Sequence, residues 1–284
     1  MNKKYFTPKK IHAYLWAAIQ LVFFLFLPSA FTTAFSGIKS VLTQIGAGNP
    51  IAWSSFLTVL LALCAYTIVF GRFFCGYACA FGTLGDAVHS LYLFLCKKCK
   101  KKPLLLKKSW KKPLSYLKYA VLLAVVLLCF LGVYGDLTGW SPWDVFSMLR
   151  SGNFKVGAYW LGCILLVLIL VGMVFCERFF CRFLCPMGAV FSLLPILPFF
   201  SVRRKREKCA KGCTACEKVC PSDLSLPEDG SWNVSGDCFQ CQKCLEICPK
   251  KNAKSSIRNF RGNEIWFTLL RAVVLAAVLI LAGI

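Results

Sequence analysis

The sequence holds few acidic residues and few histidines. Twelve Asp and Glu stand against 34 Lys and Arg, and His12 and His89 are the only histidines. A haem b held by two histidines would need both at one site, so we disfavour it. The chain has neither the G-x-x-x-x-G-K-[ST] loop nor the glycine fingerprint of dinucleotide-binding folds, which leaves ATP and NAD binding unsupported. No set of residues suggests nucleophilic or proton-transfer catalysis, so we predict no catalytic residue.

Long hydrophobic segments dominate what is present. Hydrophobic residues make up 58% of the 284 residues, and the mean hydropathy is +0.64. A net charge of +22 would suggest nucleic-acid binding in a soluble protein. Here the basic residues lie in blocks between apolar segments, as in membrane proteins, so we predict membrane lipid and no nucleic acid as a partner. Five segments are long enough to cross a bilayer, which takes roughly 20 residues: 11–31, 51–70, 118–135, 157–176 and 264–284.

The distribution of basic residues predicts the orientation. They concentrate in residues 1–10, 71–118 and 177–264, whereas the loops between hold only Lys39, Arg150 and Lys155. The positive-inside rule therefore predicts a multi-pass protein of the bacterial cytoplasmic (inner) membrane, with a cytoplasmic N-terminus and an outside C-terminus. The first span also has features of a cleaved signal peptide, although its apolar run is longer than usual. We expect Arg271, in the last span, to extend towards the cytoplasmic interface.

Eight cysteines lie within residues 209–248. The second four follow the C-x2-C-x2-C-x3-C-P spacing of two-cluster bacterial ferredoxins, in which the cysteine before the proline ligates the other cluster. This spacing predicts two [4Fe–4S] clusters. We assign one to Cys209, Cys213, Cys216 and Cys248, and the other to Cys238, Cys241, Cys244 and Cys220.

The first of these cysteine runs departs from the usual spacing. Three residues separate Cys209 from Cys213, where two are usual. Gly212 would accommodate the extra residue by taking a positive φ. Cysteine pairs of this kind also bind zinc, and disulfides would need an oxidising compartment. Two C-x3-C-P endings and the predicted cytoplasmic location favour iron–sulfur clusters over both.

A second cysteine pattern occurs twice. The motif R-F-F-C-x3-C-x2-G occupies residues 72–82 and again 178–188, each time after an apolar segment. Repeats in membrane proteins commonly place a shared site at their interface. If each motif is helical, the C-x3-C spacing puts both thiols on one helix face. We hypothesise that four thiols share a metal or iron–sulfur site or act as two redox dithiols, the alternative being buried structural thiols: Cys75, Cys79, Cys181 and Cys185.

Three weaker features remain open. Cys96 and Cys99 form a C-x2-C pair, without the histidine that a c-type haem motif requires. The basic segment 97–118 suits contact with anionic lipid headgroups or with an acidic electron-transfer partner. The aromatic stretch 135–144 has interfacial tryptophans, or else contacts a quinone or a partner.

The twin R-F-F-C-x3-C motifs, followed by a two-cluster ferredoxin pattern, resemble the membrane polyferredoxins of the NapH/NosR type. This family includes the quinol dehydrogenase membrane component of periplasmic nitrate reductase systems. Its repeated motif is C-x3-C-P, which Cys185-Pro186 matches and Cys79-Ala80 does not. The resemblance implies electron transfer between the quinone pool and redox partner subunits, and some relatives serve in metalloenzyme assembly.

We therefore predict an α-helical membrane protein of about five spans, with an internal repeat and a small α+β ferredoxin domain. The predicted units are an N-terminal anchor with an outer loop, two repeats, the ferredoxin domain and a last helix: 1–50, 51–117, 118–202, 203–258 and 259–284. The predicted function is electron transfer between [4Fe–4S] clusters, the quinone pool and a redox partner, as a subunit of an oxidoreductase. The alternative is a metalloenzyme assembly or metal-reducing factor that uses the C-x3-C thiols.

Overall fold

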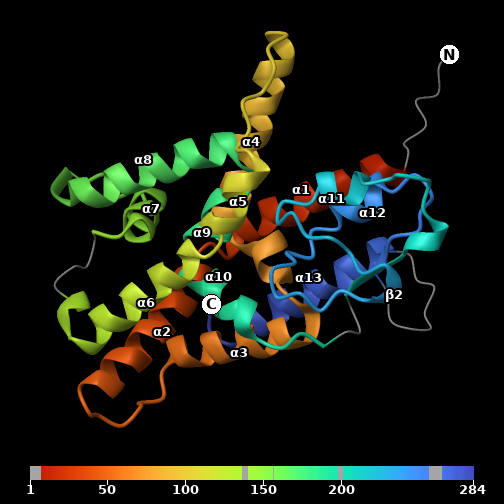
Figure 1. Ribbon diagram of the computed structural model, residues 1–284. Helices are drawn as coiled ribbons and strands as arrows, with labels where there is room; N and C mark the ends of the chain where they lie inside the picture. The colour runs from red at the N-terminus through yellow and green to blue at the C-terminus, as the bar shows by residue number, and fades with distance from the viewer. Residues whose placement is uncertain (1–7, 136–139, 156, 198–200, 256–263) are drawn as a thin grey trace.

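The computed structural model describes residues 8–135, 140–155, 157–197, 201–255 and 264–284. These residues form a predominantly helical protein with one small sheet (Figure 1). In the first half the helices are α1 (Pro8–Phe26), α2 (Ala30–Gly46), α3 (Ser55–Phe70), the π-helical turn η1 (Phe74–Ala78), α4 (Ala80–Lys98), α5 (Lys108–Leu114) and α6 (Leu117–Phe130). Then come the short turn η2 (Val133–Gly135), α7 (Pro142–Arg150), the turn η3 (Gly157–Tyr159), α8 (Trp160–Phe175), α9 (Phe179–Phe183) and α10 (Pro186–Leu193).

The C-terminal part contains the predicted ferredoxin domain, called here the ferredoxin module. Its elements are β1 (Val202–Lys205), η5 (Arg206–Lys208), α11 (Ala215–Lys218), β2 (Asp229–Trp232), α12 (Lys243–Ile247) and β3 (Lys254–Ser255), and α13 (Glu264–Leu281) follows. The sheet has the order β2-β1-β3, with both pairings antiparallel. Its small core consists of Val202, Cys216, Leu226, Leu245 and Ala253.

Two helical stretches are long and apolar enough to cross a membrane, Ser109–Phe130 and Gly157–Phe175. A third span arises if Ala13–Phe26 and Ala30–Gly46, which meet at a 60° bend, cross together. The predicted spans 51–70 and 264–284 form the shorter apolar helices α3 and α13. The chain is therefore a membrane protein, while the count of five spans and the orientation stay predictions.

The expected outer loop of residues 30–50 contains a packed helix instead. Ala30, Phe31, Ala34, Phe35 and Ile38 of α2 are all buried. Their spacing of three and four residues places them on one helix face. On this face Phe31 contacts the rings of Phe81 and Phe180, and Phe35 contacts the ring of Trp143. The helix as a whole also packs against α3 and α6. Gly37 allows the close approach, because a Cβ there would lie 2.5 Å from the carbonyl oxygen of Phe56.

Arg271 of α13 lies in the interior of the protein. Its side chain is buried, donates a hydrogen bond to the hydroxyl of Ser255 at 3.2 Å and lies over the ring of Phe73. A hydroxyl of the ferredoxin module and an aromatic ring of the first repeat receive the guanidinium, and the expected extension towards the cytoplasmic interface stays a prediction. Arg271 thus joins α13 to both parts.

Candidate functional site

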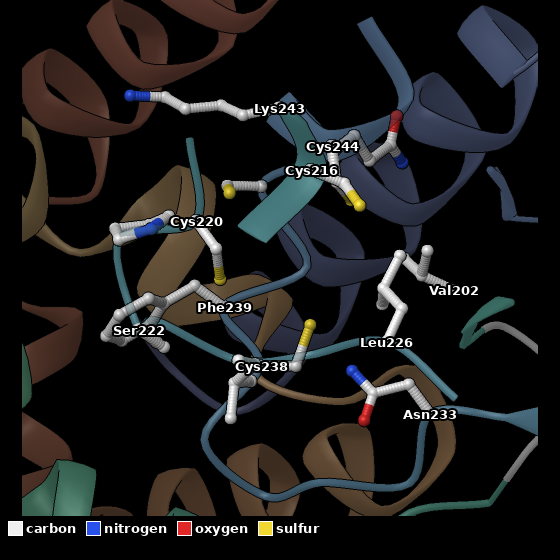
Figure 2. A pocket seen from close by; sticks show the side chains of 14 residues that line it. Val202, Cys216, Cys220, Ser222, Leu226, Asn233, Cys238, Phe239, Lys243 and Cys244 are labelled. Atoms are coloured by element: carbon white, nitrogen blue, oxygen red, sulfur yellow. The ribbon is translucent and has the colours of Figure 1, made fainter. Parts of the chain in front are cut away.

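Five cysteines of the ferredoxin module line one pocket (Figure 2). Cys238 and Cys241 lie in the loop before α12, and Cys244 lies in its first turn. Gln240 and Gln242 adopt positive φ values of 52° and 62°, so the loop curls around the pocket. Cys216 of α11 and Cys220 complete the lining. The pocket therefore brings together the four cysteines predicted for one cluster, with Cys216 beside them.

The chemistry of this pocket suits an iron–sulfur cluster. Burial raises the pKa of Cys238 to about 12 and that of Cys241 to about 11, and it also raises the pKa of Cys244. Buried thiolates need a compensating positive charge, and iron bound by sulfur supplies one. Histidine and carboxylate side chains are missing from the lining residues of this pocket. A donor set of thiolates alone is the one that [4Fe–4S] clusters use.

The second predicted set has nitrogen donors to three of its sulfurs. Asn252 donates its main-chain N–H to Cys248 Sγ at 3.2 Å and its side-chain amide to Cys209 Sγ at 3.3 Å. Arg204 donates to Cys216 Sγ at 3.0 Å. Hydrogen bonds to cluster sulfurs adjust reduction potentials. Arg204 and Asn252 were not predicted, because cysteine spacing gives no signal for the donors around it.

Cys213, the fourth member of this set, follows the irregular spacing. Gly212 takes φ +66°, as predicted for the residue that accommodates the insertion. The main-chain oxygen of Cys213 accepts a hydrogen bond from Arg206 at 3.0 Å. Over the described residues, no three His, Cys, Asp or Glu side chains are grouped tightly enough for a single metal ion.

The four cysteines of the repeated motif are buried and close to one another. The thiols of Cys79 and Cys181 lie close enough to interact, and Cys75 and Cys185 both lie close enough to act electrostatically on each other or on Cys181. We call these four residues the twin-cysteine site. The structure thus brings together the set that the repeat suggested.

Each motif is divided between two helices, which corrects the expectation of one continuous helix. Cys75 lies in η1 and Cys181 in α9, whereas Cys79 and Cys185 have extended backbones and precede the next helices as N-caps. Cys185 Sγ accepts a hydrogen bond from the N–H of Gly188 at 3.2 Å. Pro186 occupies the first position of α10, where its missing N–H costs nothing. The break gives the two thiols of each motif different helical supports.

The two copies of the motif hold each other through their arginines. Arg72 donates to the main-chain oxygen of Cys181 at 3.4 Å, and Arg178 donates to that of Cys75. The motif glycines make room for this exchange. A Cβ at Gly82 would lie 2.9 Å from the oxygen of Cys75. A Cβ at Gly188 would lie 2.9 Å from both the oxygen of Cys181 and the guanidinium of Arg72.

The two arginines have different counter-charges. Arg178 forms a buried ion pair with Asp86 of α4, which also accepts a hydrogen bond from Gln20 at 2.7 Å. Ser192 stands where the second copy would repeat Asp86. Arg72 instead lies 3.5 Å from Asp237 of the ferredoxin module.

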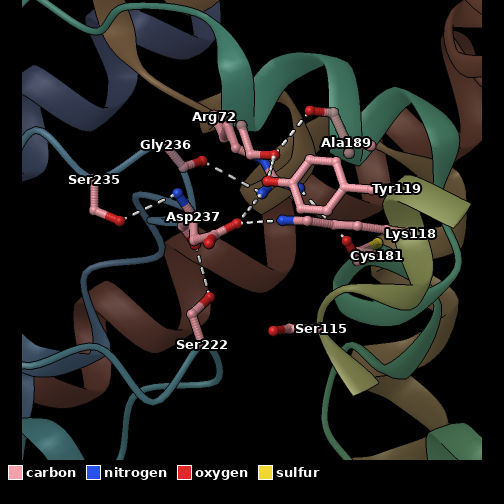
Figure 3. Close-up of polar contacts among 12 residues, drawn as sticks. Arg72, Ser115, Lys118, Tyr119, Cys181, Ala189, Ser222, Ser235, Gly236 and Asp237 are labelled. Carbon is pink, nitrogen blue, oxygen red and sulfur yellow. Dashed lines mark hydrogen bonds and ion pairs between the residues drawn. The ribbon is translucent and has the colours of Figure 1, made fainter. Parts of the chain in front are cut away.

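Asp237 also pairs with Lys118, a buried residue of α6 (Figure 3). The carboxylate is thus held by a cation of the first motif and by a cation of a neighbouring helix. Its main-chain oxygen accepts a hydrogen bond from Ser222 at 2.7 Å. These contacts join the ferredoxin module to the membrane helices.

The segment 236–241, called here the docking loop, lies directly on the twin-cysteine site. The ring of Phe239 is buried between the guanidinium groups of Arg72 and Arg178, with their Cζ atoms 4.7 Å and 5.3 Å from its centroid. Gly76, in the first motif, fits against the carbonyl oxygen of Phe239, which would lie 2.3 Å from a Cβ there. Phe239 follows Cys238 in sequence, so the residue next to a pocket cysteine contacts both copies of the repeated motif.

The remaining candidate residues lie apart from these sites. Cys96 is half-buried and Cys99 is exposed at the end of α4. Nδ1 of His89 lies 3.0 Å from the carbonyl oxygen of Val174, and the side chain of His12 lies outside the described part. Residues 136–139 of the aromatic stretch are likewise outside it.

The chain is similar in sequence to several known proteins. A family model described as a 4Fe-4S binding domain matches residues 52–113 and 158–206, which include both motifs. An uncharacterised protein of Methanocaldococcus jannaschii is 31% identical over 237 residues, or 82% of this chain and 90% of that protein. Ferredoxin-type protein NapH of Haemophilus influenzae is 27% identical over 211 residues, 70% and 67% of the two chains. Regulatory protein NosR of Stutzerimonas stutzeri is 26% identical over 215 residues, 73% of this chain and 28% of NosR.

No solved structure matches the chain. The membrane helices, the cysteine pocket and the relatives define a membrane-bound iron–sulfur protein of the electron-transfer class. The chain belongs to the NapH/NosR-type family of membrane polyferredoxins.

Proposed function

We propose that this protein transfers electrons between two [4Fe–4S] clusters of the ferredoxin module and the twin-cysteine site, and onward to the quinone pool or a redox partner. When bound, the clusters supply one-electron redox chemistry. The observation that supports this path is the docking loop, in which Phe239, next to Cys238, packs against Arg72, Gly76 and Arg178 of the two motifs. The path needs no further domain between the two sets of cysteines.

The residues of the chain have distinct parts in this proposal. One cluster is held by Cys220, Cys238, Cys241 and Cys244, and the other by Cys209, Cys213, Cys216 and Cys248. Phe239 and Cys241 pack into the core of the helical part, which excludes water from the junction. Arg72 and Arg178 fix the motif carbonyls and surround Phe239 with positive charge. We further propose that the twin-cysteine site holds an additional iron–sulfur centre or works as a pair of dithiols.

The test compares iron, acid-labile sulfide and EPR spectra of anaerobically purified wild type and of Cys75→Ala/Cys181→Ala. Two cubanes require about eight iron atoms per chain. Iron above that amount in the wild type, lost together with a spectral signal in the variant, would support an additional centre. The control is Cys64→Ala/Cys163→Ala, which removes two half-buried thiols from the helices preceding each motif.

Quinol-dependent reduction of the clusters decides between electron transfer and metalloenzyme assembly. We expect quinol to reduce the wild type and to fail with the Cys75→Ala/Cys181→Ala variant. Copper bound in a one-to-one ratio, together with no reduction by quinol, would favour the assembly function instead. Unchanged iron content, spectra and reduction in the variant would confine the redox chemistry to the ferredoxin module.

A further inference from the structure

One face of the ferredoxin module carries a cleft whose lining is almost wholly basic. Its volume is about 380 Å³, and its walls come from β1, η5, β2, β3 and the segment before β3. Seven of the nine lining residues are Lys or Arg, and none is acidic: Arg203, Arg204, Lys205, Lys208, Lys250, Lys251 and Lys254. We call this surface the basic cleft.

The charge of the basic cleft is largely uncompensated by the chain itself. Within the described ranges, Arg204 is the one residue of the seven that forms an ion pair, with Glu217 at 3.6 Å. Arg203 lies over the ring of Trp232 at 4.5 Å, which fixes its guanidinium without neutralising it. The contrast is the cleft beside Arg72 and Lys118, which includes Asp223 and Asp237 among its lining residues. An open surface with this excess of positive charge attracts an acidic partner.

The floor of the basic cleft touches the sulfur atoms of one cluster set. Asn252 lines the cleft and donates hydrogen bonds to the sulfurs of Cys209 and Cys248. Arg204 lines it as well and donates to Cys216 Sγ. A molecule seated in the cleft is therefore separated from three predicted cluster ligands by single side chains. No such contact joins the basic segment after α4 to a cluster cysteine among the described residues.

We propose that the basic cleft is the docking surface for a small acidic electron-carrier protein that exchanges one electron with the cluster of Cys209, Cys213, Cys216 and Cys248. This inference rests on the proposed function for its redox part. In one direction the reduced carrier loses one electron and the cluster gains it, with no bond formed or broken. Charge complementarity selects an anionic partner, and the contact of Arg204 and Asn252 with cluster ligands favours an electron carrier over a lipid surface or a nucleic acid.

The test measures binding of a fluorescently labelled plant-type [2Fe–2S] ferredoxin, an acidic carrier, to the full-length protein in neutral detergent. The variant is Lys250→Glu/Lys251→Glu/Lys254→Glu, and the matched control is Lys100→Glu/Lys101→Glu/Lys102→Glu in the exposed segment after α4. We expect Kd to rise at least about tenfold in the cleft variant at low salt, with a flatter salt dependence, and to stay unchanged in the control. Iron content and EPR spectra equal to wild type verify that the cleft variant is folded.

Three results would overturn the docking proposal. The first is that both triple substitutions weaken ferredoxin binding equally, and the second is that binding to the wild type does not depend on salt. The third is that single-stranded RNA or anionic vesicles bind more tightly than ferredoxin through the same lysines. Dithionite, a small reductant, separates this failure from failure of the proposed function. Clusters that dithionite and quinol still reduce, without ferredoxin binding, would leave electron transfer standing and remove only the docking surface.

Discussion

Arg72 donates a hydrogen bond to the main-chain oxygen of Cys181, which lies 109 positions further along the chain. The reciprocal bond from Arg178 to Cys75 gives the two repeats a pseudo-twofold relationship at the twin-cysteine site. In each motif, the main-chain oxygen of the first cysteine accepts a hydrogen bond from the arginine of the other motif. Each copy therefore depends on the other for its local geometry. Four predictions follow from the contacts around this exchange and around the clusters.

Removing one partner of the buried ion pair between Arg178 and Asp86 should destabilise the protein more than removing both. We expect Asp86→Asn to destabilise the protein by about 3–5 kcal/mol, because it leaves a buried guanidinium without its carboxylate. The double variant Asp86→Asn/Arg178→Gln should recover part of this loss. Thermal unfolding in detergent measures both, with the exposed Asp229→Asn as control. Additive losses in the double variant would contradict the coupling.

The motif glycines should resist even a methyl group. Gly82→Ala and Gly188→Ala place a Cβ 2.9 Å from a cysteine carbonyl, so we expect each to cost about 1–3 kcal/mol and to displace the facing arginine. The matched control is Gly157→Ala, where a Cβ meets nothing within 4 Å. Thermal unfolding and the reactivity of Cys75 and Cys181 with maleimide report the change. Wild-type stability and cysteine reactivity in both glycine variants would show that the arginine–carbonyl contacts accommodate a methyl group despite these short distances.

The contact of Asp237 with Arg72 and Lys118 should hold the docking loop in place. Asp237→Asn leaves two buried cations without their shared carboxylate, and we expect a loss of about 1–3 kcal/mol in local stability. Hydrogen exchange of residues 236–241 should become faster, while exchange in β1 stays unchanged. The control is Asp229→Asn on the exposed edge of the sheet. Equal protection of the docking loop in variant and wild type would show that Phe239 alone holds it.

Donors to the cluster sulfurs should adjust one cluster and not the other. We expect Arg204→Gln and Asn252→Ala to lower the midpoint potential of the cluster predicted at Cys209–Cys248 by roughly 20–60 mV. That range is the one-electron equivalent of a hydrogen bond worth about 0.5–1.5 kcal/mol. EPR-monitored redox titration resolves the two clusters, and the second cluster is the internal control. A shift of both clusters by the same amount would indicate a general change of charge instead of the loss of these bonds.

The sequence alone predicted what depends on short spacings and on repetition. Cysteine intervals located the pocket set, the position of Gly212 predicted its positive φ, and the two R-F-F-C-x3-C copies predicted that their four thiols lie close together. The packing of α2 was missed, although its buried residues follow a helical period, because its polar residues made it read as a loop.

Other features were beyond the reach of the sequence, because they depend on contacts between distant segments. The burial of Phe239 between two arginines joins residues more than sixty positions apart, and no local pattern marks it. The break of each motif at Cys79 and Cys185 was hidden for a similar reason. A C-x3-C spacing fits a helix face, and only the next helix reveals that the second cysteine is a cap.

The second repeat has Ser192 at the position equivalent to Asp86, and Asp237 of the ferredoxin module supplies the missing carboxylate. Asp86 of the first repeat neutralises Arg178 of the second, whereas Arg72 of the first repeat receives its carboxylate from the module. Withdrawal of the module would therefore expose an uncompensated charge at the centre of the helical part. The ion pairs of Asp237 with Arg72 and Lys118 therefore hold the module against the helical part of the chain.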